Sequence, residues 1–299
     1  MLDVLRAMRV FLRVAELGSF SAAARGINMS QPMISRQIGM LEDHFGTQLV
    51  QRSTRHLHLT EEGEALREHA RRIIDQLEAA EEAIGRGARP PSGRVRLSSP
   101  TAFGLYLSGQ MAAFHQLYPD IDIALRLSDE TVNLIEDGLD LALYVGGVPE
   151  TSMIVRKIGS ARRLLVAAPC YMDGRAEPSS PAQLKDFDCL TYAGPGSDTA
   201  WAFITGGLSS PLPVHSWFSS SSSEATRRAA LAGAGIAALP HYMVEQDLQE
   251  GRLIELLPQD RMEPLAVFVA YASTRHLAPR CRVLIDFIAR TFKNAPGTI

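Results

Sequence analysis

The chain has 299 residues, of which 46% are apolar, 21% charged and 7% aromatic, which is enough for two or three domains with hydrophobic cores. Its formal net charge of -3 argues against a protein that coats nucleic acid or membranes along its whole length. Three cysteines without CxxC spacing indicate neither a disulfide framework nor a zinc site. Because the first apolar segment is interrupted by charges and no apolar stretch reaches about 18 residues, we expect a cytoplasmic protein, neither secreted nor membrane-embedded.

The charge is unevenly distributed along the chain. Residues 1–60 hold seven arginines and four acidic residues, a net of +3. Residues 97–299 hold sixteen basic and twenty-one acidic residues, a net of -5. The average therefore conceals a basic and an acidic region, and two separate functions are expected.

The basic region carries the pattern of a small helical domain. Apolar residues at helical spacing (Leu5, Met8, Leu12, Ala15) precede Gly18, and we expect Ser21 to cap a short helix through Arg25. Ser30 and Pro32 begin a further helix, whose predicted apolar face is Ile34, Ile38, Leu41 and Phe45. Two short apolar segments, 49–50 and 57–59, flank a basic turn. This order predicts a winged helix-turn-helix over residues 1–60.

A long helix is expected next. Thr60, Glu61 and Glu62 suit a helix N-terminus, and a heptad seam follows at Leu66, Ala70, Ile73, Leu77, Ala80 and Ile84. Such a seam indicates a partner helix, most simply one from a second copy of the chain. Residues 85–93, rich in Gly and Pro, break the pattern. We therefore assign residues 61–93 to a dimerisation helix and hinge.

Residues 94–299 alternate strands with helices, which is typical of α/β layers. The predicted strands are 95–98, 121–127, 141–145, 164–168, 190–192, 236–239 and 265–272, and the predicted helices are 101–118, 131–137, 222–232 and 279–292. The fold class is therefore α+β multidomain, with an N-terminal winged helix-turn-helix, a long linker helix and a C-terminal α/β domain.

The outward face of the second helix of the helix-turn-helix is suited to reading DNA. Gln31 can pair with adenine, Arg36 with guanine or phosphate, and Ser35 is short enough for close approach. The alternative is an amphipathic helix that is merely polar outside. A basic turn placed where a wing would flank the groove weighs against that alternative. The predicted DNA contacts are Ser30, Gln31, Pro32, Ser35, Arg36, Arg52, Ser53, Thr54 and Arg55.

These residues also form a recognisable string. It includes Gly18-Ser19-Phe20-Ser21, Ser30-Gln31-Pro32, Ile34-Ser35-Arg36-Gln37-Ile38, Phe45-Gly46 and Leu59-Thr60, and it resembles the LysR-type bacterial transcriptional regulators. The resemblance continues through Tyr118-Pro119, Asp140-Leu141-Ala142 and residues 229–240. It implies an effector domain resembling periplasmic binding proteins, with subdomain I near 94–164 and 269–299, subdomain II near 165–268, and crossover strands near 164–168 and 265–269. Val50-Gln51 and Tyr144 depart from the family pattern.

Two serine-rich segments are candidates for a ligand site. Residues 98–101 and 219–223 each close a strand and open a helix, and helix N-termini with hydroxyl groups bind anions. If both face one cleft, the effector is a small molecule with an anionic group. The alternative is that these serines only cap helices, and that the aromatic candidates belong to the core. The predicted ligand residues are Ser99, Pro100, Thr101, Phe103, Tyr144, Gly146, Trp201, Ser221 and Ser222.

No catalytic motif emerges from the sequence. Gly233 to Ala238 fits a dinucleotide-binding string, but the string follows a helix and leads into a strand, which is the reverse of the required order. The pair His56 and His58 lacks a third metal ligand. We therefore expect no enzyme activity, cofactor or metal. The expected function is a ligand-responsive transcriptional regulator, a dimer or tetramer that binds an inverted-repeat operator and contacts RNA polymerase. A binding protein or enzyme with a basic appendage, and a regulator that needs no ligand, are the alternatives.

Overall fold

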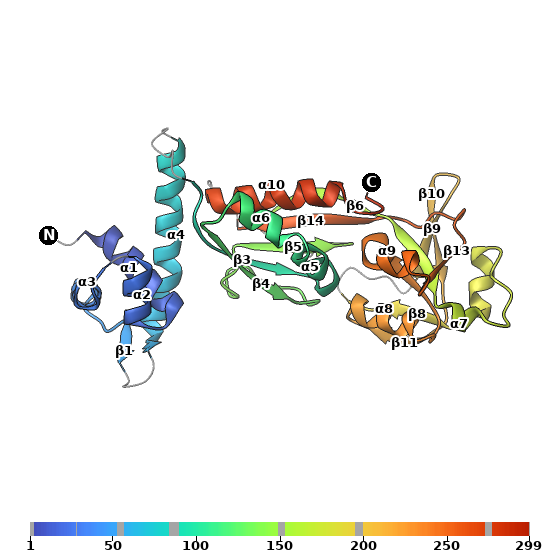
Figure 1. The fold of residues 1–299 in the computed structure, drawn as a ribbon, viewed down its shortest axis with the longest axis horizontal. Helices are drawn as coiled ribbons and strands as arrows, with labels where there is room; N and C mark the ends of the chain where they lie inside the picture. Colours follow the sequence, from blue (N-terminus) through green and yellow to red (C-terminus); the bar gives the residue numbers. More distant parts are fainter. Residues whose placement is uncertain are drawn as a thin grey trace. The chain divides into compact units, whose positions relative to one another are not determined.

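The computed structural model describes residues 3–27, 29–52, 57–83, 90–148, 153–194, 200–272 and 277–298. Backbone contacts divide the chain into two compact units (Figure 1). The first contains α1 (Val4–Leu17), α2 (Phe20–Gly26), α3 (Gln31–Phe45), β1 (Val50–Arg52), β2 (Leu57–Leu59) and α4 (Glu61–Ala83). The second contains the remaining strands and helices. Residues 85–89 of the predicted linker lie outside the described residues. Its last residue, Gly93, is the first residue of a strand.

The first unit is a helix-turn-helix followed by an antiparallel hairpin. Val50 pairs with Leu59 and Arg52 with Leu57, so the two short apolar segments predicted on either side of the basic turn contribute the paired strands. The core joins α1, α2, α3, the hairpin and the start of α4, and its fully buried members include Phe11, Ile34 and Leu41. The winged helix-turn-helix predicted from the sequence is therefore present.

Some details of this unit differ from the prediction. Ser19, not Ser21, caps α2, because its hydroxyl accepts a hydrogen bond from Ala22 N at 3.3 Å. The side chains of Leu5, Phe45 and Ile73 are exposed rather than part of the predicted apolar faces. On α1 the buried face consists instead of Ala7, Met8, Val10, Phe11 and Val14, so it is rotated about the helix axis relative to the predicted face. On α4, Ala70 and the partly buried Leu66 pack into the core of this unit, so the first part of the predicted heptad seam is occupied within the chain.

The second unit contains two five-stranded mixed sheets. The first sheet has the order β4-β3-β5-β14-β6 and the second β11-β8-β12-β7-β13. In both sheets the first three strands are parallel to one another, and the fourth strand pairs antiparallel with the third and with the fifth. The two sheets therefore share one topology, although the sequence shows no repeat. The strands of the first sheet are β3 (Gly93–Ser99), β4 (Ile121–Leu127), β5 (Leu141–Val145), β6 (Ile154–Ala161) and β14 (Leu265–Tyr271). Those of the second are β7 (Arg163–Ala167), β8 (Cys189–Tyr192), β11 (Ser216–Ser220), β12 (Ile236–Pro240) and β13 (Ile254–Leu256).

Helices cover both sheets. The first sheet carries α5 (Thr101–Ser108), α6 (Met111–Leu117) and α10 (Pro279–Lys293), and we call this assembly the first subdomain. Aromatic contacts hold these helices together, with Phe114 of α6 and Phe287 of α10 at a ring distance of 5.1 Å. The second subdomain carries α7 (Pro169–Met172), a short 3-10 helix (Pro181–Asp186), α8 (Ser223–Leu231), α9 (His241–Gln249) and the hairpin of β9 (Ala200–Thr205) and β10 (Leu208–Pro213).

Two predicted helices of the first subdomain are wrong. The helix expected over 101–118 is two helices with a break at Gly109 and Gln110, where glycine is a poor helix former. The helix expected over 131–137 is a hydrogen-bonded turn. In it Asn133 Oδ1 accepts from Ile135 N at 3.1 Å, and Asp137 Oδ2 accepts from Asn133 N at 3.0 Å. Such side-chain bonds compete with helical ones.

The chain passes twice between the sheets. Only Arg162 separates β6 of the first sheet from β7 of the second, so the expected crossover at 164–168 lies just beyond the crossing. On the return, β14 pairs within the first sheet along its whole length. The second crossing therefore precedes Leu265 and does not fall within 265–269.

Two glycines of the first unit have opposite surroundings, and they predict opposite effects of alanine. A Cβ on Gly63 would lie 2.1 Å from the backbone oxygen of Leu49, whereas a Cβ on Gly39 would have nothing within 4 Å. We expect Gly63→Ala to lower the free energy of unfolding by about 1–3 kcal/mol through overpacking. Gly39→Ala should raise it by about 1 kcal/mol through helix propensity. Hydrogen exchange of the α3 and α4 amides measures both, and a harmless Gly63→Ala would contradict the packing described.

Candidate functional site

The first candidate site is the exposed start of α3. Ile34, Ile38 and Leu41 are fully buried, whereas Gln31, Pro32 and Arg36 are exposed and Ser35 is half-buried. Ser30 stands at the N-cap position without a side-chain capping bond. The first unit therefore presents to solvent the polar side chains of α3 that the sequence predicts to contact DNA.

Neighbouring elements hold this helix in place. Ser21 of α2 donates a hydrogen bond to Gln31 Oε1 at 3.1 Å. Glu42, near the other end of α3, accepts from Leu49 N at 2.9 Å and Val50 N at 3.2 Å through one carboxylate oxygen. The carboxylate thus joins α3 to the first strand of the hairpin, a positioning role that the sequence did not indicate. Arg52 ends β1, whereas Ser53, Thr54 and Arg55 lie outside the described residues.

The second candidate site is a cavity of about 260 Å³ in the second unit. It is lined by residues at or just beyond the carboxyl ends of six parallel strands, three from each sheet, namely Ser98, Ser128, Gly146, Tyr192, Ser223 and Pro240. In open α/β sheets, ligands bind at the carboxyl ends of the strands, at the point where the connections from two neighbouring strands lead to opposite sides of the sheet. The duplicated topology therefore brings two such edges to one cavity.

The structure brings together four of the nine predicted ligand residues. Pro100, Tyr144, Gly146 and Trp201 line the cavity. Ser99, Thr101, Phe103, Ser221 and Ser222 are not among the lining residues. Since strand side chains alternate between faces, Ser98 lines the cavity and its neighbour Ser99 points away, with its hydroxyl donating to Pro100 O at 3.1 Å. Phe103 is core, packed edge-on against Tyr242 and Phe292. At the start of α8 it is Ser223, one residue after the predicted pair, that lines the cavity.

The N-terminus of α5 is not free to bind an anion. Thr101 N donates to Asp129 Oδ1 at 2.9 Å, so a carboxylate of the chain already occupies one of the two positions expected for an anionic effector. Asp129 lies 28 positions from Thr101 in the sequence, so no local pattern indicates this contact.

Several cavity residues were missed by the sequence reasoning. Asp129, Glu130, Arg163, Tyr192, Tyr242 and Glu263 all line the cavity. Asp129 and Glu130 follow a predicted strand and Tyr192 ends another, so the signal for these three was their place at a strand's carboxyl end. Burial raises the pKa of Tyr144, Tyr192 and Tyr242, and the charge of Asp129 adds to the rise at the last two. That carboxylate is therefore close to tyrosines of the other subdomain.

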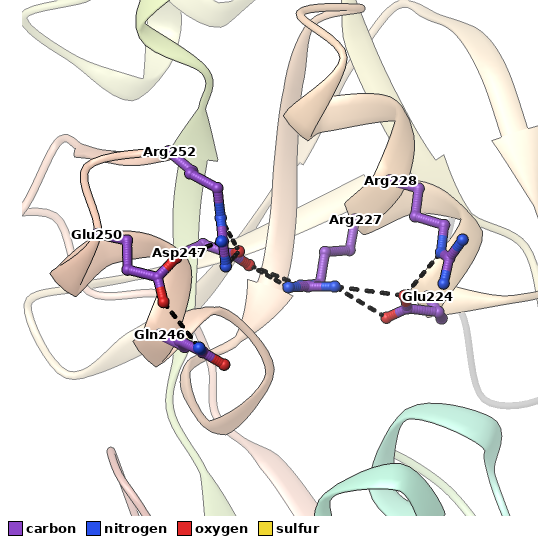
Figure 2. A network of polar contacts seen from close by, with 7 residues as sticks. All are labelled: Glu224, Arg227, Arg228, Gln246, Asp247, Glu250 and Arg252. Atoms are coloured by element: carbon purple, nitrogen blue, oxygen red, sulfur yellow. Dashed lines mark hydrogen bonds and ion pairs between the residues drawn. The ribbon is translucent and has the colours of Figure 1, made fainter.

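A buried ion-pair network supports the second subdomain's side of the cavity (Figure 2). Asp247 of α9 is fully buried, and it binds Arg227 of α8 at 2.6 Å and Arg252 at 2.7 Å. Arg227 also contacts Glu224 in the first turn of α8 at 3.3 Å. The network ties α8 to α9, and both helices contribute cavity residues, Ser223 and Tyr242.

Comparisons with known proteins match the two units of the chain to two different family models. The family model described as "Bacterial regulatory helix-turn-helix protein, lysR family" matches residues 5–64, and the one described as "LysR substrate binding domain" matches residues 88–293. The "HTH-type transcriptional regulator CrgA" of Neisseria meningitidis is 34% identical over 289 residues, 96% of each chain. Its solved structure aligns with a TM-score of 0.61 at 32% identity, covering 96% of this chain and 98% of that one. The full-length structure of the Vibrio cholerae virulence activator AphB aligns with a TM-score of 0.57 at 28% identity, covering 95% and 98%. Within the described residues, no helix is long and apolar enough to cross a membrane.

The Asp247 network predicts a specific loss of stability. Asp247→Ala leaves Arg227 in a mostly buried site without its main partner, so we expect the free energy of unfolding to fall by about 3 kcal/mol. Glu250→Ala, which removes an exposed partner of Arg252 and of Gln246, should cost less than about 1 kcal/mol. The two tryptophans, Trp201 and Trp217, both lie in the second subdomain, so their fluorescence during urea unfolding reports on this part. Equal losses in the two variants would contradict the role given to Asp247.

Proposed function

The chain belongs to the LysR family of bacterial transcriptional regulators, and from this we propose that α3 and the hairpin read operator DNA under the control of a small molecule bound in the 260 Å³ cavity. The family assignment makes it a DNA-binding regulator with a substrate-binding domain. The observation that carries the DNA-binding residues is the division of α3. Ile34, Ile38 and Leu41 are fully buried, and Gln31, Pro32 and Arg36 near the start of the helix are exposed to solvent. A major groove admits a helix presented in this way.

The proposed complex is a dimer or tetramer on an inverted-repeat operator. The exposed side chain of Ile73 supports a role for α4 in self-association, since an apolar residue on a helix surface is available to a second copy. Contact with RNA polymerase is part of the same proposal and rests on the family relationship alone. The proposed contacts of Ser53, Thr54 and Arg55 with DNA rest on the sequence.

Effector binding would act through the arrangement of the two subdomains. The cavity is lined by residues of both sheets, so a ligand that contacts both stabilises one mutual arrangement over others. We propose that this shift changes the spacing of the DNA-reading units or the bending of the operator. An anionic group on the effector is also proposed. It is supported by Ser223 at the start of α8 and by the guanidinium of Arg163, both of which line the cavity.

Arg36→Ala tests the DNA-reading surface. If Arg36 contacts a base, the variant should bind promoter DNA about tenfold or more weakly at fixed salt, with reduced discrimination at one position of the operator. If it contacts a phosphate, all sequences should weaken alike and the salt dependence should drop by about one ion. Arg67→Ala is the matched control, because Arg67 is an exposed arginine of α4 paired with Glu64 at 2.6 Å. Electrophoretic mobility shifts measure all three proteins, and unchanged affinity of Arg36→Ala would refute the assignment.

A ligand screen tests the sensing role. A compound that binds the cavity at 100 times its dissociation constant should stabilise the folded chain by about 2.7 kcal/mol. It should also alter the mobility or the footprint of the promoter complex. Thermal unfolding followed by tryptophan fluorescence is a suitable first measurement, across carboxylates, amines and aromatic compounds. A chain that binds promoter DNA and responds to no compound would be a regulator that needs no ligand.

A further inference from the structure

The charges around the cavity favour a ligand with a positive group. Three of the lining residues are acidic, Asp129, Glu130 and Glu263, and among the described lining residues only Arg163 is basic. The formal balance of three carboxylates and one guanidinium is -2. Arg163 already donates from Nε to the backbone oxygen of Glu263 at 3.1 Å. A ligand that carried only negative charge would therefore enter a cavity with an unfavourable net potential.

Asp129 has the means to bind a ligand directly. Its Oδ1 accepts one hydrogen bond, from Thr101 N at 2.9 Å, and a carboxylate offers about four acceptor positions on two oxygens. The bond places this carboxylate at the start of α5, where the helix carries partial positive charge. Asp129 is thus a negative group fixed at the cavity wall with acceptor capacity beyond its bond to the backbone.

Aromatic rings line the same cavity as this carboxylate. Tyr144, Tyr192, Trp201 and Tyr242 line the cavity, the first from the first subdomain and the others from the second. Tyr144, Trp201 and Tyr242 are each less than a tenth exposed. Faces of aromatic rings attract ammonium and guanidinium groups, most strongly where water is excluded. A cavity lined by a carboxylate and by aromatic rings offers both kinds of group that attract an organic cation.

We propose that the effector carries a protonated amino or guanidino group, bound by Asp129 and by aromatic rings that line the same cavity. This inference rests on the proposed function of the cavity as the effector site. Together with the anionic group proposed above, held on the side of Ser223 and Arg163, it identifies the effector as a small zwitterion of the amino-acid class.

The test uses ligands that differ by one charged group. The full-length protein is titrated with the proteinogenic L-amino acids, and affinity is measured by thermal unfolding and isothermal calorimetry. Each amino acid that binds is then compared with its deaminated analogue, which keeps the carboxylate, and with its decarboxylated amine. We expect at least one amino acid to bind, and its deaminated analogue to bind about tenfold or more weakly, equivalent to about 1.4 kcal/mol.

The variant Asp129→Asn locates the positive group. The asparagine side-chain oxygen can still accept from Thr101 N, so the variant removes the charge and keeps the contact, and the melting temperature without ligand checks its fold. It should weaken the amino acid about tenfold and leave the already weak deaminated analogue unchanged. Glu136→Gln is the matched control, because Glu136 is an exposed acid seven positions along the chain that does not line the cavity.

Three results would overturn the proposal. They are no binding by any amino acid, deaminated analogues that bind as tightly as their parents, and equal weakening of both ligands by Asp129→Asn. Mobility shifts of promoter DNA, run in parallel, distinguish failure of the zwitterion proposal from failure of the proposed function. A carboxylate without an amine that stabilises the protein and alters the DNA complex would sustain the effector role and refute the zwitterion. Failure of the wild-type chain to bind promoter DNA would refute the proposed function itself.

Discussion

The second unit depends on the crossing of the chain at Arg162. The backbone N–H of this residue donates to Gly297 O at 2.8 Å, and its carbonyl accepts from His241 N at 2.9 Å. Its guanidinium contacts Glu255 at 2.7 Å. One residue between two strands of different sheets is thus anchored by α9, β13 and the C-terminal segment. This crossing sets where the sheets meet, and the carboxyl ends of both sets of parallel strands line one cavity.

Within the cavity, Asp129 decides the balance of charge. A helix N-terminus at the end of a strand is ordinarily an anion site, because its N–H groups lack partners within the helix. Here the loop after β4 places a carboxylate on the first N–H of α5, which changes a site for anions into a wall with a fixed negative charge. A single hydrogen bond thereby makes the start of α5 different from the start of α8, whose N-cap residue makes no side-chain capping bond.

The sequence predicts the order of elements well where hydrophobic periodicity is strong. The strands 121–127 and 141–145 and the helix from Pro279 are found with the expected starts. It fails where long-range contacts decide. A shift of one residue exchanges the two faces of a strand, which is why the sequence predicts Ser99 where Ser98 lines the cavity. Asn133 and Asp137 form a turn in place of a helix because their side chains bond to the backbone. Tyr242 and Glu263 reach the cavity only through the sheet topology, which no local pattern encodes.

The buried network around Asp247 bears on how a bound effector could be sensed. Arg227 and Asp247 join α8 to α9, the two helices that contribute Ser223 and Tyr242 to the cavity. Interiors packed in this way have discrete arrangements and deform little. A ligand that joins Asp129 of the first subdomain to residues of the second therefore changes the relation between subdomains more readily than the shape of either. Any such change has to alter the contacts that join the subdomains, namely the packing of Tyr242 against Phe103 and Phe292 and the anchored backbone at Arg162. The response to an effector is thus expected to be a rotation of whole subdomains, with the interior of each preserved.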